Sequence, residues 1–96
     1  MSQDSRAPKM VRFRLHADPS PCLLPRLLQP FARRDLTPDH VQSRRTGDRM
    51  DVEIVLHAMP ADTVHLILGN LTQIVGVRQV TTAEATPLSP PLSQAA

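Results

Sequence analysis

The sequence predicts an α+β domain in which two helices cover one face of a four-stranded antiparallel sheet. Four segments resemble strands, and two longer segments between them carry an apolar stripe with helical spacing. Their order along the chain is strand, helix, strand, strand, helix, strand. With 96 residues, the chain has room for one such unit and little else. The expected strands are residues 9–17, 39–45, 50–58 and 77–81.

The first strand follows a polar segment, residues 1–8, which is expected to be a flexible arm. Apolar and polar side chains alternate along residues 9–17, as in a strand with one buried face. We expect Val11, Phe13 and Leu15 to face the helices. The side chains expected on the opposite face are Arg12, Arg14 and His16.

The first helix is predicted from a stripe of Leu24, Leu27, Leu28 and Phe31. A turn at residues 18–21 precedes it, with Ser20 as the expected cap and Pro21 as the expected first helical residue. Two further prolines lie within the stripe. Pro25 fits the first turn, but an interior proline costs about 3 kcal/mol, so we expect a bend at Pro30 with helix resuming to Arg34.

A hairpin is predicted for the second and third strands, with residues 46–49 as its turn. The third strand alternates over residues 50–58. Its side chains expected to face the helices are Val52, Ile54, Leu56 and Ala58, and those expected outside are Asp51, Glu53, Val55 and His57.

The second helix is predicted to begin near Pro60 and Asp62, which suit a first turn. Gly69 within it is expected to allow close packing, and Gly76 is expected to cap its end. The domain is expected to span residues 9–82, with a disordered tail rich in Pro, Ser and Ala over residues 83–96. The apolar stripe of this second predicted helix consists of Val64, Ile67, Leu68, Leu71, Ile74 and Val75.

Right-handed crossovers in this element order give a ferredoxin-like βαββαβ sandwich with strand order 4-1-3-2. That order places Arg12 and Arg14 beside the strand that carries Asp51 and Glu53, on the face without helices. Cross-strand ion pairs are expected there, each stabilising by about 0.2–1 kcal/mol.

Composition excludes several classes of function. The net charge of +2 is spread over interspersed acids and bases, and the strands expose charged side chains rather than base-stacking aromatics, so no nucleic-acid partner is expected. A single cysteine fits a reducing compartment, and no apolar run approaches the ~18 residues of a membrane span. We therefore expect a cytoplasmic protein.

Catalytic and metal-binding constellations are weak. Asp51 and Glu53 share a strand face but are better explained as partners of the neighbouring arginines. Cys22 has no histidine placed by sequence to activate it, and the four histidines lack metal-ligand spacing. We expect no catalysis, no metal and no cofactor in this chain. A small ferredoxin-like enzyme remains an alternative, which would require a cleft with a perturbed acid or base.

Three segments of the chain carry a family resemblance. Residues 24–34 have a Leu-x-Arg-aliphatic-aliphatic helix with a basic end, residues 52–56 an aliphatic strand, and residues 68–77 a second aliphatic helix. On these segments, which resemble the first helix, third strand and second helix of the family, residues 9–82 resemble an ACT domain, and more narrowly the small regulatory subunit of acetolactate synthase. The resemblance implies a regulatory subunit that binds and activates a large catalytic subunit in branched-chain amino-acid biosynthesis. It assigns thiamine diphosphate, FAD and magnesium to that large subunit. The alternative is a stand-alone amino-acid-sensing or dimerisation module for another enzyme.

The resemblance also marks an effector site for a branched-chain amino acid and implies side-by-side homodimers with a continuous sheet. The family's Asp-x-Pro-Gly-x-Leu motif has its nearest match at residues 18–24, where Cys22 stands in the glycine position. Since Pro19, Pro21 and Pro25 remove N–H donors, weak effector binding or none is expected. The implied effector-site residues are Asp18, Ser20, Pro21, Cys22, Leu23, Leu24, Thr37 and Asp39.

Overall fold

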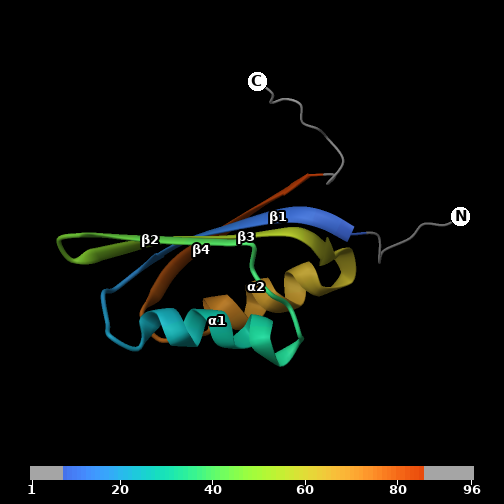
Figure 1. Ribbon diagram of the computed structural model, residues 1–96. Coiled ribbons are helices and arrows are strands. Elements are labelled where there is room, and N and C mark those ends of the chain that lie inside the picture. The colour runs from blue at the N-terminus through green and yellow to red at the C-terminus, as the bar shows by residue number, and fades with distance from the viewer. Residues whose placement is uncertain (1–7, 86–96) are drawn as a thin grey trace, which may run out of the picture.

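The structure, a computed structural model, describes residues 8–85 and confirms the predicted α+β sandwich. A four-stranded antiparallel sheet has the order β2-β3-β1-β4, and both helices lie on one of its faces (Figure 1). The elements are β1 (Pro8–Ala17), α1 (Leu23–Arg33), β2 (His40–Thr46), β3 (Arg49–Pro60), a 3₁₀ turn (Ala61–Thr63), α2 (Val64–Thr72) and β4 (Val77–Ala85).

The core lies between the sheet and the helices and is entirely apolar. The predicted inward residues of β1 and the helix stripes form most of it, and the ring of Phe13 meets that of Phe31 edge-on at 5.5 Å between centroids. Leu24 and Leu28 are only partly buried at its margin. The buried members are Val11, Phe13, Leu15, Ala17, Leu23, Leu27, Phe31, Val52, Ile54, Leu56, Met59, Val64, Ile67 and Leu71.

A β-bulge changes the end of β3. Leu56 pairs with Val11 and Met59 pairs with Lys9, so three steps along β3 match two along β1. The extra residue shifts the alternation of side chains, and Met59 is buried while Ala58 is exposed. The prediction that Ala58 faces the helices is therefore wrong.

The helix α1 begins later than predicted. Residues 20–23 form a turn closed by a hydrogen bond from the Leu23 N–H to the Ser20 carbonyl, and Cys22 rather than Ser20 precedes the helix. Pro25 is the third residue of α1 and so lies in its first turn, as expected. Helical conformation continues across Pro30 to Arg33, and the Pro30 ring is buried, which offsets part of the cost of its lost hydrogen bond.

The helix α2 ends at Thr72, before the last two residues of its predicted stripe. Ile74 is half-buried and Val75 is exposed in the turn that follows. A Cβ added at Gly69 would meet nothing within 4 Å, so the expected close packing is absent at this position. Gly76 adopts a φ of 96° in the turn before β4 instead of capping the helix directly.

The strand β4 extends to Ala85, four residues beyond its predicted end at residue 81 and three beyond the predicted end of the domain at residue 82, because it stays paired with β1 as far as Met10. Likewise Pro8 belongs to β1 rather than to the predicted arm. An ion pair of 3.4 Å between Lys9 and Glu84 joins these strand ends. The rest of the predicted arm and tail, residues 1–7 and 86–96, lies outside the described residues.

Candidate functional site

The loop after β1 and the first turn of α1 contain six of the eight predicted effector-site residues, and polar groups of the loop bind within the protein. The Asp18 carboxylate accepts two hydrogen bonds from the Arg78 guanidinium, at 3.1 and 2.9 Å. This contact raises the pKa of Arg78. The backbone N–H of Asp18 donates to the Gly76 carbonyl at 2.8 Å. The first residue of the predicted site is thus fixed to the turn between α2 and β4.

The amides at the start of α1 are partly occupied as well. The N–H of Cys22 donates to the Ser20 hydroxyl at 3.3 Å, and the N–H of Leu23 donates to the Ser20 carbonyl at 3.1 Å. A carboxylate would have to displace both bonds in order to use these donors. The Leu23 side chain is buried in the core, and Leu24 is half-buried.

The remaining predicted site residues lie at the other end of α1. The Asp39 N–H donates to the Val55 carbonyl, and its carboxylate accepts the His57 N–H at 2.7 Å. Thr37 lies close by and lines a separate groove of about 420 Å³ beside β2. Because α1 has 11 residues, about 16 Å of helix separates the two groups. Within one chain, the structure does not bring the eight predicted residues into one pocket.

The loop itself borders a second shallow hollow. Pro19, Ser20 and Pro21 face Arg45 and Met50 of the β2–β3 hairpin across a space of about 360 Å³. This places Ser20 and Pro21 near the hairpin and away from Thr37 and Asp39. The hairpin turn itself is as predicted, since Thr46 pairs with Arg49 around Gly47, whose φ is 61°.

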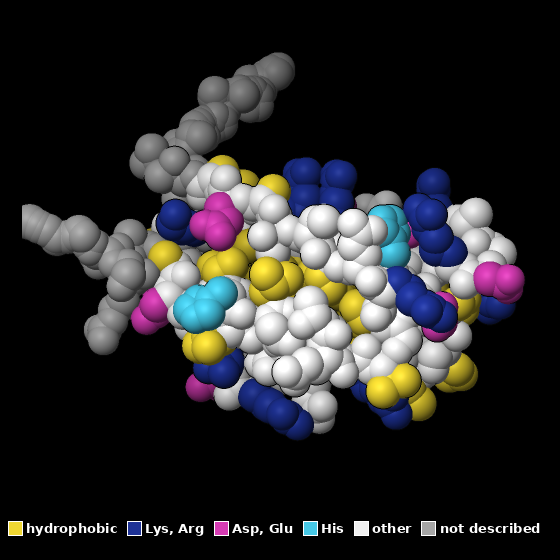
Figure 2. All heavy atoms as spheres, turned by 180° about the vertical axis from the view of Figure 1, so that it is seen from behind, with side chains coloured by type: hydrophobic (Ala, Val, Ile, Leu, Met, Phe, Trp, Pro, Cys, Tyr) yellow, Lys and Arg dark blue, Asp and Glu magenta, His cyan; other side chains and the backbone are white. Residues whose placement is uncertain are grey.

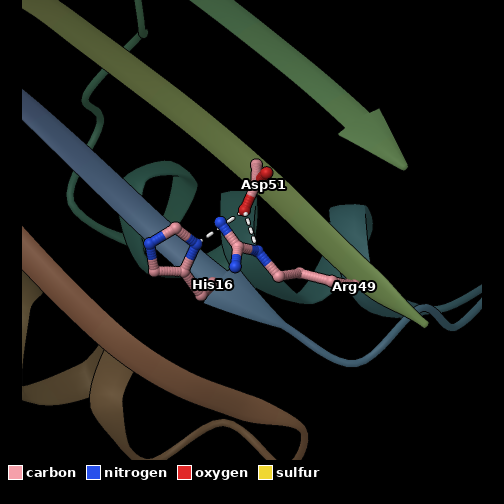
Figure 3. A network of polar contacts seen from close by, with 3 residues as sticks. All are labelled: His16, Arg49 and Asp51. Atoms are coloured by element: carbon pink, nitrogen blue, oxygen red, sulfur yellow. Dashed lines mark hydrogen bonds and ion pairs between the residues drawn. The ribbon is translucent and has the colours of Figure 1, made fainter. Parts of the chain in front are cut away.

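The helix-free face of the sheet carries the predicted cross-strand ion pairs. Glu53 binds Arg12 at 2.9 Å and Arg14 at 3.7 Å. Asp51 instead accepts contacts from His16 at 2.6 Å and Arg49 at 2.9 Å (Figure 3). Arg49 and His16 lower the pKa of the Asp51 carboxyl, with the Arg49 hydrogen bond as the largest cause. Sequence reasoning missed both partners of Asp51. The register of β1 and β3 places His16 opposite Asp51, and Arg49 lies two residues before Asp51 on β3.

The His16–Asp51 pair lies on an open, solvated part of the helix-free face. It borders an open hollow of about 500 Å³ together with Arg14, Arg44 and Thr81. The His16 and Asp51 side chains are 40% and 36% exposed, and a general base gains its strength in a site that excludes water. The carboxylates here are bound by basic side chains, as in a stabilised surface network.

Three further features of residues 8–85 concern metal binding, membrane crossing and the single cysteine. No group of three or more His, Cys, Asp or Glu side chains is placed to hold a metal ion in this part of the chain. None of its helices is long and apolar enough to cross a membrane. Cys22 is exposed and unpaired by any disulfide.

The described chain is a ferredoxin-like βαββαβ sandwich in which several acidic side chains are paired with basic ones. The ACT-like domain family model matches residues 4–89, and the chain belongs to this family. Domains of this family are regulatory modules. A search of curated proteins found no match.

Two solved structures have the same fold. One is the ACT domain of GTP pyrophosphokinase from Chlorobium tepidum, with a TM-score of 0.63 and 9% identity over 77% of this chain and 84% of that one. The other is the ligand-free regulatory subunit of aspartate kinase from Thermus thermophilus, with a TM-score of 0.58 and 15% identity. The match to that longer protein covers 83% of this chain and 57% of the other.

Proposed function

We propose that this chain is a non-catalytic regulatory subunit that binds and activates the large catalytic subunit of acetolactate synthase. Membership of the ACT-like family supports a regulatory role, and residues 24–34, 52–56 and 68–77 resemble the small subunit of that enzyme. In this proposal thiamine diphosphate, FAD and magnesium belong to the large subunit, and both subunits work in the cytoplasm. The observation that carries the regulatory role is the family match over residues 4–89.

Subunit contacts, rather than an amino acid, are proposed as the main means of regulation. The Cys22 and Leu23 amides are bonded within the loop, and Asp18 is bound by Arg78. Any branched-chain amino acid would therefore bind weakly or not at all at this loop. Isothermal titration with valine, leucine and isoleucine tests this. Tight, saturable binding that a Cys22→Trp change abolishes would contradict it.

A homodimer through β2 is part of the proposal. All seven residues of β2 are exposed, and its outer edge is unpaired in the described chain. An apolar groove lined by Leu28, Leu36 and Val41 runs beside it on the helical side. A second copy that adds its own β2 would continue the sheet and cover this groove, which accounts for an edge that is otherwise open to non-specific pairing.

The alternative is a regulatory or dimerisation module for another enzyme. The similar folds come from GTP pyrophosphokinase and aspartate kinase, so the same architecture occurs in other enzyme systems. This alternative shares the regulatory role and differs in the identity of the catalytic partner.

Co-expression with the acetolactate synthase large subunit of the same organism tests the partner. We expect the two chains to co-elute and the purified large subunit to form acetolactate faster when this chain is added. A large subunit that neither co-elutes with the folded chain nor responds to it would refute this partner, and would leave the alternative standing.

A further inference from the structure

A groove between the two helices carries two arginines that have no carboxylate partner within residues 8–85. It lies where α1 meets the C-terminal end of α2, and its volume is about 310 Å³. Residues of α1 form one wall, and residues 70–75 form the other. Its lining residues are Arg26, Gln29, Pro30, Arg33, Asn70, Gln73, Ile74 and Val75.

Two arginines without partners give the groove its charge. Arg26 and Arg33 are seven residues apart in α1 and so lie on one side of the helix, about 10 Å from each other along its axis. No lining residue is acidic, and neither guanidinium contacts a carboxylate within residues 8–85. Among the other described arginines, 12, 14, 49 and 78 each bind an Asp or Glu, whereas 34, 44 and 45 also have no carboxylate partner.

The helix end that faces the groove compensates little of this charge. The C-terminal end of α2 carries about half a negative charge, against two full positive charges from Arg26 and Arg33. The carbonyls of Asn70 and Leu71 also accept hydrogen bonds from the N–H groups of residues 73 and 74. The groove therefore keeps a net positive potential and ten guanidinium N–H donors in total. Figure 2 shows Lys and Arg side chains along the lower, helical margin as well as above the sheet.

An exposed apolar side chain completes the groove. Val75 is 82% exposed, the highest value among the large apolar residues of the described chain, and the half-buried Ile74 adjoins it. A free inorganic anion would use the arginines and leave Val75 in water. Adjacent cationic and apolar groups instead match a polypeptide segment that presents both carboxylates and an apolar side chain.

We propose that the α1–α2 groove binds an acidic, partly apolar segment of the partner polypeptide. One carboxylate of that segment pairs with Arg26 and a second, about 10 Å away, pairs with Arg33, each through two parallel hydrogen bonds. Two glutamates two turns apart on a helix have this spacing. The apolar side chain between them rests on Val75. The inference rests on the proposed function in one respect, that the chain acts on another polypeptide. It holds whichever enzyme that polypeptide belongs to.

The test uses the full chain labelled with ¹⁵N and a helical peptide with two glutamates two turns apart and a leucine between them. We expect the peptide to shift the backbone resonances of Gln29, Asn70, Gln73 and Val75. The double variant Arg26→Glu, Arg33→Glu should weaken binding at least about tenfold, since each lost charge-assisted pair is replaced by repulsion. The matched control Arg12→Glu, Arg14→Glu makes the same charge change on the helix-free face of β1 and should bind the peptide as the native chain does. Arg26→Gln, Arg33→Gln provides a second variant without new charges, and circular dichroism confirms that each variant folds.

Three results would overturn the inference. They are the absence of groove shifts at millimolar peptide, equal losses of peptide binding in the groove and β1 variants, and the same saturable shifts with inorganic phosphate alone, which would assign the groove to a small anion. Activation assays separate this inference from the proposed function. A catalytic subunit that responds fully to the Arg26→Glu, Arg33→Glu chain would refute partner binding in the groove and leave the regulatory role intact.

Discussion

Asp18 and Arg78, sixty residues apart in the sequence, form a two-pronged ion pair that joins the end of β1 to the start of β4. The Asp18 backbone strengthens the same junction through its hydrogen bond to Gly76. The loop that the family resemblance marks as an effector site is thereby held by the domain itself. A variant of Arg78 therefore tests how much this junction contributes to the stability of the domain.

Replacing Arg78 with Gln should lower the melting temperature slightly at low ionic strength. The pair is exposed, so salt screens it, and the difference from the native chain should shrink as sodium chloride is raised to about 1 M. Thermal unfolding followed by circular dichroism measures both values. Arg26→Gln is the control, since Arg26 has no carboxylate partner in the described chain. A deficit of Arg78→Gln that persists unchanged in high salt would show that packing, not charge, accounts for it.

The Asp51 network should make stability fall in acid. Its partners Arg49 and His16 depress the folded-state pKa of Asp51 below the ordinary 3.8, so the unfolded chain binds its proton first as pH falls. The contribution is therefore complete above about pH 4 and is lost as pH drops through the lower, folded-state pKa. In Asp51→Asn, urea unfolding should show a flatter dependence on pH in this acidic range. Asp48→Asn, in the hairpin turn, is the matched control, and an equal flattening there would contradict the assignment.

Gly69→Ala should stabilise the protein by about 0.5–1 kcal/mol. The glycine is exposed inside α2, a Cβ there would meet nothing within 4 Å, and alanine restricts the unfolded backbone. Gly76→Ala should do the reverse, because Gly76 has a φ of 96°, which alanine adopts only with strain. Urea titrations at neutral pH give both differences. A loss of stability in Gly69→Ala would reveal a neighbour that covers α2 in solution.

Val41→Glu should weaken self-association while leaving the fold intact. Val41 is 41% exposed on β2 and borders the apolar groove that a second copy is proposed to cover. We expect light scattering at tens of micromolar to show dimers of the native chain and mostly monomers of the variant. Leu66→Glu, with the same exposure on α2, is the control. A native chain that is monomeric at this concentration, or a Leu66 variant that dissociates equally, would argue against pairing through β2.

The fold could be predicted because its apolar pattern agrees with its topology at nearly every step. Alternation along β1 and β3 identified the inward residues, and strand order then placed Arg12 and Arg14 beside Glu53. Short-range pattern also placed the hairpin turn correctly. The errors concerned mainly the ends of helices and features that depend on pairing between distant segments.

Three of the errors in the sequence-based prediction have clear physical causes. The bulge at residues 57–58 arises from the register between β3 and β1, which the sequence of β3 alone does not contain. The end of β4 has little apolar alternation, yet β1 supplies backbone partners as far as Ala85. The predicted effector site combined residues 18–24 with residues 37–39 on the family resemblance alone, and the predicted helix between them is long enough to hold the two groups apart in one chain.

The pairing of Met10 with Ala85 has a consequence for how such a domain is carried within larger proteins. The strand that enters the domain and the strand that leaves it are neighbours in the sheet, and the Lys9–Glu84 ion pair lies beside that junction. A host polypeptide could therefore leave one of its surface loops, run through this whole sandwich and return to almost the same point without stretching its own framework. A domain with neighbouring entry and exit strands is thus suited to insertion into a surface loop of a larger protein.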